Sequence, residues 1–305
     1  MNPRVTFIAI LCALLIPLAG FAPCHAGTLQ QTAQQLYASL SDDQKKQATL
    51  PYDAPERIKE VFTGGVRAGV HIKDLNPDQQ ALAMSLLTGF TSDYGKQKSI
   101  AIADQPSNTQ DPTTGFVRYY LCFFGEPGEG KTYAWRIAEH HLTLVHMEVE
   151  KGEPASFGPI LLGANPPTLF DEEEEKLLAL YAAMTPDERA KSKHSGKGIS
   201  SEMLKSDAGI RVGDLNPSAK QAAQAMFDHR LSFYSEPIAT RVKKIVDSNG
   251  GLDAMRIVYY GDVAKKCRDG GRWDFKLAGK SFLCDYEGSR AHIHFSMKGK
   301  LAESK

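Results

Sequence analysis

Two short histidine pairs are the residues of this sequence best suited to chemistry. The first, His292 and His294, has one residue between its members. Side chains of a β-strand alternate between its two faces, so residues two apart share a face, with Cα atoms about 6.5 Å apart. That separation lets two imidazole nitrogens reach one ion at about 2 Å each. The spacing therefore predicts a histidine chelate on one strand.

The second pair follows an acidic residue at the expected tip of a β-hairpin, in the order Glu139, His140, His141. Adjacent side chains at such a tip can both turn toward a shared cleft. Imidazole is the commonest protein ligand for zinc, copper and iron. We therefore expect a transition-metal site, with Glu139 as a fifth ligand or a catalytic general base. The expected metal ligands are His140, His141, His292 and His294. The alternative is a polar cleft that binds no metal.

The elements that must position these residues follow an internal repeat. Residues Gly69–Pro77 read Gly-Val-His-Ile-Lys-Asp-Leu-Asn-Pro, and Gly209–Pro217 read Gly-Ile-Arg-Val-Gly-Asp-Leu-Asn-Pro. The same offset of 140 residues (from 69 to 209) carries Val117–Tyr120 onto Ile257–Tyr260. A constant offset over a long segment indicates duplication.

Each unit is expected to hold a helical segment followed by an antiparallel β-meander. Asn76 and Asn216 are good helix N-caps, and each precedes a proline that suits the first helical turn. The fold class predicted is α+β, a tandem duplication with a pseudo-twofold axis, whose repeats cover residues 27–168 and 169–305. Whether the two sheets merge is left open. Alternating patterns and glycine-rich turns predict strands at Phe116–Phe124, Tyr133–Ala138, His141–Val149, Pro159–Gly163, Met255–Gly261, Arg272–Ala278, Phe282–Tyr286 and His292–Met297.

The repeat makes the histidine pairs more informative. By the offset, His140 and His141 correspond to Lys280 and Ser281, so this pair is not duplicated. The pair at the end of the second unit likewise has no histidine counterpart in the first. Each unit thus carries a pair that the other lacks, as expected for one composite site between the units.

The other polar residues carry weaker patterns. His71 stands where the second unit has an arginine, so we expect it to be exposed. His146 lies on a predicted strand and is a candidate neighbour of the metal ligands. Asp285 and Glu287 precede the second histidine pair and are able to supply a carboxylate. The acidic run 171–175 is expected to begin a helix, whose dipole favours negative charge there.

One segment matches a nucleotide-binding loop in pattern only. Gly125–Thr132 fits the Gly-x-x-x-x-Gly-Lys-Thr signature. A phosphate-binding loop needs a helix behind it, whereas Tyr133–Val149 alternates like a strand hairpin. We therefore interpret the segment as a polar hairpin turn.

The N-terminal 26 residues have the pattern of a signal peptide. Arg4 gives a basic start, and the apolar stretch Val5–Phe21 is followed by small residues up to Ala26. The stretch is interrupted by Pro17 and Gly20 and falls short of the roughly 20 apolar residues that span a membrane. We expect cleavage after Ala26, a periplasmic or secreted location, and no stable membrane insertion afterwards.

Composition and cysteine content restrict the function further. The chain has 36 basic and 36 acidic residues among 305, so its net charge gives nucleic-acid binding no support. Three cysteines follow the expected cleavage site, an odd number, which leaves one unpaired in an oxidising compartment. Cys267 and Cys284 lie 17 residues apart and are able to form a disulfide, which would leave Cys122 as a buried thiol.

Three segments carry a resemblance to a known family. They are Trp135–Leu142 (Trp-Arg-Ile-Ala-Glu-His-His-Leu), Leu161–Pro166 (Leu-Leu-Gly-Ala-Asn-Pro) and His292–His294. Together, and in this order, they resemble the domain of unknown function family numbered 3500. This sequence departs from the family in having Glu139 in place of a usual Gly and Ala291 in place of a usual Asn. The resemblance implies no activity, but it implies that the two histidine motifs define the site.

These patterns favour an exported metal-binding protein. Its activity would be that of a metal-dependent hydrolase or oxidase acting on a small molecule, two classes that both use open histidine-rich sites. The alternative is a non-catalytic module that binds a small ligand in the cleft between the repeats, with Tyr119, Trp135 and Tyr259 as its aromatic lining.

Overall fold

The computed structural model describes residues 28–107, 112–150, 155–194, 208–263, 265–289 and 292–302. Within these ranges the chain forms eight α-helices and one mixed sheet of twelve strands, which confirms the α+β class. The predicted signal peptide, residues 1–26, lies outside the described residues. None of the described helices combines the length and the apolar character needed to cross a membrane.

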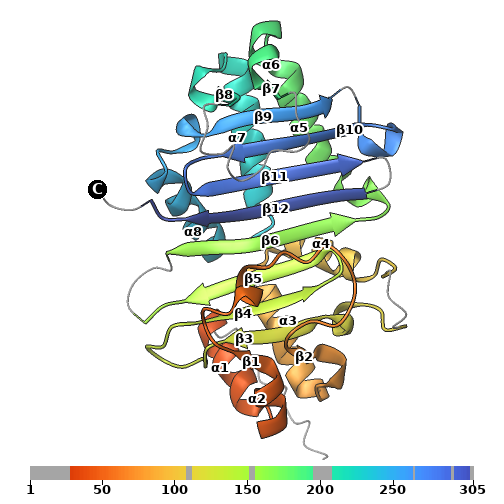
Figure 1. Cartoon of the computed structure of the whole chain (residues 1–305), viewed down its shortest axis with the longest axis vertical. Coiled ribbons are helices and arrows are strands. Elements are labelled where there is room, and N and C mark those ends of the chain that lie inside the picture. The colour runs from red at the N-terminus through yellow and green to blue at the C-terminus, as the bar shows by residue number, and fades with distance from the viewer. Residues whose placement is uncertain are drawn as a thin grey trace, which may run out of the picture.

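The sheet joins both meanders into one surface (Figure 1). Its long strands are, in spatial order, β3 (Tyr120–Phe124), β4 (Tyr133–Glu139), β5 (Leu142–Glu148), β6 (Ser156–Ala164), β12 (His292–Lys300), β11 (Phe282–Ser289), β10 (Arg272–Ala278) and β9 (Arg256–Asp262). The short strands β1 (Thr49–Leu50) and β2 (Val70–His71) pair with β3, and β7 (Lys193–His194) and β8 (Ile210–Arg211) pair with β9. At the centre β6 pairs antiparallel with β12, so the sheets of the two halves merge into one, a point that the sequence left open.

The helices pack behind the sheet in the view of Figure 1. They are α1 (Leu29–Ser39), α2 (Asp42–Ala48), α3 (Pro77–Phe90), α4 (Asp93–Ala103), α5 (Asp171–Ala183), α6 (Pro186–Ser192), α7 (Pro217–Leu231) and α8 (Glu236–Ser248). The side chain of Asn76 accepts the N–H of Gln79 at the start of α3, and Asn216 accepts that of Ala219 at the start of α7. Both predicted N-caps are therefore confirmed, as is the start of α5 in the acidic run at Asp171.

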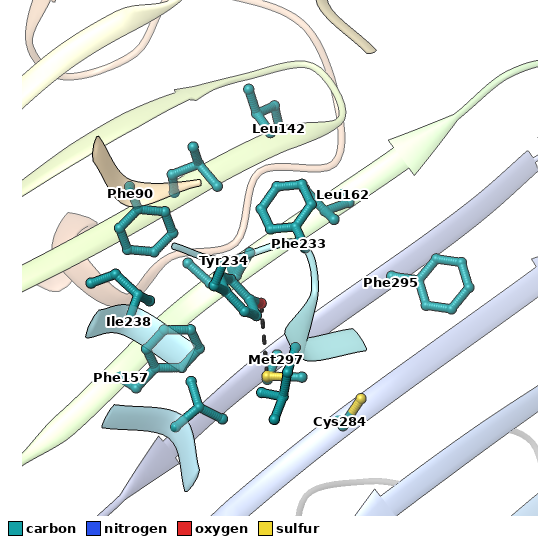
Figure 2. Close-up of a cluster of buried hydrophobic side chains, with 14 of the residues drawn as sticks. Phe90, Leu142, Phe157, Leu162, Phe233, Tyr234, Ile238, Cys284, Phe295 and Met297 are labelled. Carbon is teal, nitrogen blue, oxygen red and sulfur yellow. Dashed lines mark hydrogen bonds between the residues drawn. The ribbon is translucent and has the colours of Figure 1, made fainter. Parts of the chain in front are cut away.

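The main hydrophobic core lies between the helices and the sheet (Figure 2). Beneath the β6–β12 seam, Leu162, Phe295 and Met297 are buried together with Tyr234 from the α7–α8 connection. Side chains alternate along a strand. Because Phe295 and Met297 point into this core, His294 projects from the opposite face of the sheet.

A connection crosses that opposite face of the first meander (Figure 1). We call residues 51–69, between β1 and β2, the strap. Its Tyr52 and Ala68 pack on a second, smaller apolar cluster that includes Phe124 and Met147. Hydrogen bonds fix it further, including one of 3.3 Å from the backbone N–H of Val61 to the Thr143 hydroxyl. The strap thus covers the first meander on the side away from the helices.

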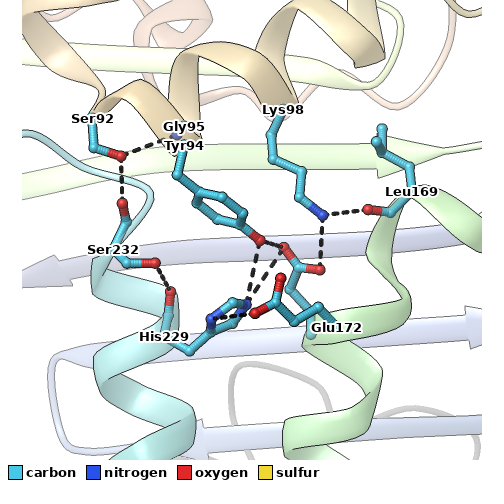
Figure 3. A network of polar contacts seen from close by, with 9 residues as sticks. Ser92, Tyr94, Gly95, Lys98, Leu169, Glu172, His229 and Ser232 are labelled. Carbon is cyan, nitrogen blue, oxygen red and sulfur yellow. Dashed lines mark hydrogen bonds and ion pairs between the residues drawn. The ribbon is translucent and has the colours of Figure 1, made fainter.

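A polar network joins α4, α5 and α7 (Figure 3). The Tyr94 hydroxyl donates to Glu173 at 2.6 Å, and Lys98 lies 3.1 Å from the same carboxylate. Burial alone would raise the pKa of Glu173, but hydrogen bonds from His229 and Tyr94 and the charge of Lys98 hold it at about 2. The carboxylate is therefore charged at neutral pH and ties the three helices together.

Two predictions about loops have opposite outcomes. Residues 125–132 link the antiparallel strands β3 and β4 without a helix, so the hairpin interpretation of the nucleotide-loop pattern is confirmed. The considered disulfide is absent, because Cys267 and Cys284 are both free and buried. Cys267 lies in a 3₁₀ turn, with its sulfur 3.0 Å from the Tyr286 hydroxyl, and Cys284 faces the core (Figure 2).

Candidate metal centre

Three imidazoles converge where the β4–β5 hairpin meets the central seam of the sheet. The Nε2 atom of His292 lies 2.7 Å from Nε2 of His141 and 2.9 Å from Nε2 of His294. A ligand atom from each of the three lies within 4.8 Å of the others. Among the described residues this is the one such group of three or more His, Cys, Asp or Glu side chains, and it could hold a metal ion.

Strand geometry places two of these ligands as the sequence predicted. His292 and His294 stand two residues apart on β12 and share its helix-free face. His141 comes from the other half of the chain, at the two-residue connection between β4 and β5. The group therefore combines residues from before and after the predicted boundary at 168/169.

The backbone of His141 adopts a left-handed conformation to reach this position. Its φ is 65°, the one positive φ of a non-glycine residue in the described ranges. Such a conformation costs an L-residue about 1–2 kcal/mol, and costs of this kind persist mainly where surrounding structure enforces them. Here the His141 carbonyl accepts a 2.7 Å hydrogen bond from the Gly163 N–H on β6.

Gly163 forms the floor beneath the imidazoles. It pairs with His294 across the β6–β12 seam. A Cβ atom at Gly163 would lie 2.8 Å from Cδ2 of His141 and 2.9 Å from Cδ2 of His294, closer than real contacts allow. Only glycine fits at this position without moving the ligands. No local pattern in the sequence marked Gly163 as a site residue, although it lies in the segment Leu161–Pro166, one of the three that carry the family resemblance.

The electrostatics keep the imidazoles neutral. Burial, followed by the neighbouring histidines and Arg118, lowers the pKa of His141 to about 2. Burial and the neighbouring His292 and His140 lower that of His294 to about 4. Burial also lowers the pKa of His292. Neutral imidazole nitrogens at pH 7 have the lone pairs that metal coordination requires.

Hydrogen bonds alone cannot satisfy the three converging imidazole nitrogens. Each nitrogen of a neutral imidazole is either one donor or one acceptor. His292 Nε2 faces both His141 Nε2 and His294 Nε2, so it can form a full hydrogen bond with only one of them. A cation between the three nitrogens would satisfy all of them. Around a tetrahedral zinc ion the nitrogens would be about 3.3 Å apart, a little more than the 2.7 and 2.9 Å that separate His292 Nε2 from its two neighbours.

His140 lies beside the converging group rather than in it. Its ring stacks on that of His141 with centroids 3.8 Å apart, and burial lowers its pKa to about 4. Its backbone carbonyl accepts a 3.0 Å hydrogen bond from the buried Tyr119 hydroxyl, which fixes the hairpin tip. The structure therefore brings together three of the four predicted ligands, and His140 packs against one of them.

Glu139 turns away from the three imidazoles. One carboxylate oxygen accepts the N–H of Gly65 in the strap at 3.0 Å, and the other lies 3.5 Å from Nε of the buried Arg118. Its carboxylate is not part of the converging group. These contacts connect the strap to the hairpin that carries His141.

A different carboxylate stands beside the site. Glu287 is the cross-strand partner of His294 on β11, and its Oε2 lies 4.0 Å from Nδ1 of that histidine. Asp285 instead pairs with Lys276 at 2.7 Å. The ring of Phe62, from the strap, meets the His294 ring edge-on at 5.0 Å between centroids. Of the two acidic residues considered from the sequence, only Glu287 approaches a ligand.

Two predictions about other histidines need correction. His71 is buried, not exposed, because its ring stacks on Tyr120 and its Nε2 lies 2.9 Å from the Arg118 carbonyl oxygen. His146 bonds Glu148 at 2.7 Å on the helix side of β5 and has no contact with the three converging imidazoles. His146 does lie on a strand as predicted, but its side chain points to the face of the sheet opposite the site.

The aromatic lining expected for a ligand cleft is not formed. Tyr119, Trp135 and Tyr259 are at most 1% exposed and belong to the main core. The Tyr259 hydroxyl donates to the Leu177 carbonyl of α5, far along the sheet from β6. These rings therefore stabilise the fold and do not line a cleft.

Comparisons with known proteins give one match. A family model described as a protein of unknown function (DUF3500) matches residues 24–299, nearly the whole chain. No curated protein and no solved structure matches the chain. The comparisons therefore extend no activity to the three-histidine group.

Proposed function

The chain belongs to the DUF3500 family of proteins of unknown function, and we propose that it binds a transition metal ion through His141, His292 and His294. The observation that carries the proposal is the convergence of three Nε2 atoms from two distant parts of the chain. Three protein ligands that leave a position for water or substrate are typical of catalytic zinc sites, whereas structural sites use four. Zinc, copper and iron all suit imidazole ligands.

The proposed reaction is hydrolysis or oxidation of a small molecule. When bound, the ion would supply Lewis-acid activation of water or, if it is a redox metal, activation of oxygen. His141, His292 and His294 hold it, and Glu287 orients His294 from the Nδ1 side, as outer carboxylates commonly do at metal sites. Gly163 leaves the room that the imidazoles need.

The residues around the ligands have positioning roles in this proposal. His140 covers one face of the His141 ring and keeps water from it. Glu139 ties the strap to the hairpin through Gly65. Phe62 covers the edge of His294 and makes the strap side of the site apolar. A catalytic role for Glu139 stays a prediction of the sequence, since its present contacts are with Gly65 and Arg118.

Cobalt substitution tests the proposal and its open coordination position together. Protein without a polyhistidine tag is loaded with Co²⁺, and its visible absorption is recorded with and without azide. We expect the intense bands of a four-coordinate ion, a shift of these bands on adding azide, and loss of both in His141→Ala. A weak six-coordinate spectrum, or bands that persist in His141→Ala, would reject this ligand set.

We also propose that the protein is exported and periplasmic or secreted. The support is the basic, apolar and small-residue pattern of residues 1–26. Fractionation of a bacterial host that expresses the full sequence, followed by N-terminal sequencing, checks it. The expected result is a mature chain that begins at Gly27 outside the cytoplasm. An intact N-terminus on cytoplasmic protein would reject export.

We infer, finally, that the two halves are a tandem duplication related by a pseudo-twofold axis. The support is the constant offset of 140 residues and the matching order of elements. In both halves a 3₁₀ turn and a long helix (α3 or α7) precede four antiparallel strands, and the first of these strands pairs with two short ones. Superposition of the halves in a crystal structure checks it: strands should overlie strands in register, and a mismatch of order would reject it.

A further inference from the structure

A groove of about 700 Å³ lies at the opposite end of β12 from the histidines. Its walls come from Tyr52, Arg57 and Ile58 of the strap, from the start of β6, from the turn between β10 and β11, and from the end of β12. This volume falls within the range of about 300–1,000 Å³ that is usual for small-molecule sites. The groove shares no lining residue with the three-histidine group.

The charge of the groove is one-sided. Its described lining contains four cationic residues, Arg57, Lys280, Lys298 and Lys300, and no Asp or Glu. Since the chain has equal numbers of acidic and basic residues, this bias reflects where residues are placed and not composition. Lys298 pairs with Glu60 of the strap at 3.3 Å. The exposed Lys280 and Lys300 have no ion-pair partner in the described part of the chain.

The rest of the lining is largely apolar. Ile58 is 63% exposed, and among the large hydrophobic side chains of the described residues only Val66 is more open to solvent. Pro159 and Leu283 lie on the sheet side of the groove, whereas the Phe157 ring packs in the main core. Arg57 lies over the Tyr52 ring at 4.3 Å, which adds an aromatic surface beneath a cation. A cationic rim over an apolar floor is complementary to a molecule with an apolar body and an anionic end.

We propose that this groove binds a free amphipathic anion: a small molecule with an apolar body and one carboxylate, sulfonate or phosphate group. Lys280 and Lys300 receive the anionic group, and Ile58, Pro159 and Leu283 contact the apolar body. Because the groove and the histidine group share no residue, binding does not depend on the metal. The proposal thus stands apart from the proposed function and is tested separately.

Titration calorimetry with dodecanoate, below the concentration at which it forms micelles, tests the proposal on the whole protein. The probe is compared with acetate, which lacks the body, and with an uncharged alkyl glycoside, which lacks the anion. The variant Lys280→Gln/Lys300→Gln is compared with Lys46→Gln/Lys243→Gln, which removes the same charge from exposed sites on α2 and α8.

We expect one dodecanoate per chain, with acetate and the glycoside each bound at least tenfold more weakly. Loss of Lys280 and Lys300 should weaken dodecanoate binding roughly fivefold, as expected for two exposed ion pairs, and the control variant should not. Raising the salt to 1 M should weaken binding in the wild type by a similar factor. His292→Ala/His294→Ala should bind dodecanoate as the wild type does.

Three results would overturn the proposal. One is equal affinity for dodecanoate and the glycoside, and another is equal affinity in the two lysine variants. The third is binding to vesicles that contain anionic lipid without binding to monomeric dodecanoate, which would make the groove a membrane contact instead. Melting temperatures of both variants, measured alongside, should match the wild type because all four lysines are exposed.

Discussion

Replacement of Gly163 by alanine separates metal binding from folding. The new methyl group would lie 2.8 Å from Cδ2 and 2.9 Å from Cγ of His141, and 2.9 Å from Cδ2 of His294. Both rings must then move away from the seam between β6 and β12. A matched control exists on β12: at Gly299 a methyl group would meet Ile245 at 2.8 Å and Phe282 at 2.9 Å, well away from the histidines.

The two substitutions should cost similar stability. Overpacking of a buried site by one methyl group costs about 1–3 kcal/mol, and neither glycine has a positive φ. For a chain of this size each kcal/mol lowers the melting temperature by about 2–4 °C. We therefore expect a decrease of roughly 3–10 °C in both variants. Metal affinity should differ, because Gly163→Ala displaces two ligands, and loss of even an outer-shell partner typically costs about 10–100-fold in metal affinity.

The assay is a competition titration of Zn²⁺ against a chromophoric chelator, with thermal unfolding of the same metal-free samples. The expected result is a 10–100-fold weaker zinc affinity in Gly163→Ala and an unchanged affinity in Gly299→Ala, at comparable melting temperatures. Equal zinc affinity in Gly163→Ala and the wild type would refute the assignment of Gly163 as the floor of the site. A parallel loss in Gly299→Ala would attribute the effect to general destabilisation.

Two further predictions concern carboxylates. Glu287→Gln should weaken zinc binding about two- to tenfold, less than the roughly 10–100-fold typical of outer-shell partners, because Glu287 is half exposed and 4.0 Å from His294. The zinc titration measures this, and unchanged affinity would remove Glu287 from the site. The pKa of Glu173 in the folded protein is about 2, below the ordinary value for glutamate near 4.3. The stabilisation that its charge provides is therefore complete above about pH 4.5 and is lost as the pH falls toward 2. In urea unfolding, Glu173→Gln should therefore be about 1–3 kcal/mol less stable than the wild type at pH 7, with the difference shrinking between pH 4.5 and 2. A difference that stays constant with pH would contradict the role given to this carboxylate.

Local spacing was sufficient to predict part of the site. The period of two along a strand placed His292 and His294 on one face, and the polar tip between alternating segments placed His141 at a hairpin turn. These predictions depend on residues close together in the sequence. They required no knowledge of how the two halves of the chain meet.

The remainder depends on contacts between distant residues. That β6 pairs with β12, and that Gly163 lies under two imidazoles as a result, follows from pairing across about 130 residues of chain. The length of β6 was underestimated for a local reason, because Gly158 and Pro159 are poor strand residues. The structure accommodates them opposite a β-bulge between Met297 and Gly299.

The burial of polar residues was the least predictable feature. The repeat predicted an exposed His71 because its counterpart is Arg211, which is indeed exposed. In the structure the ring of His71 stacks on Tyr120 and meets the Arg118 carbonyl instead. Equivalent positions of a repeat therefore need not share an environment when neighbouring side chains differ.

Metal content tests the central claim most directly. Protein without a polyhistidine tag, purified without chelator, is analysed for zinc, copper and iron beside His292→Ala/His294→Ala and the control His71→Gln/His194→Gln, which removes two histidines outside the site. We expect close to one ion per chain in the wild type and the control, and none in the His292→Ala/His294→Ala variant. Absence of metal from all three, even after incubation with each ion, would contradict the metal site, as would equal metal content in all three.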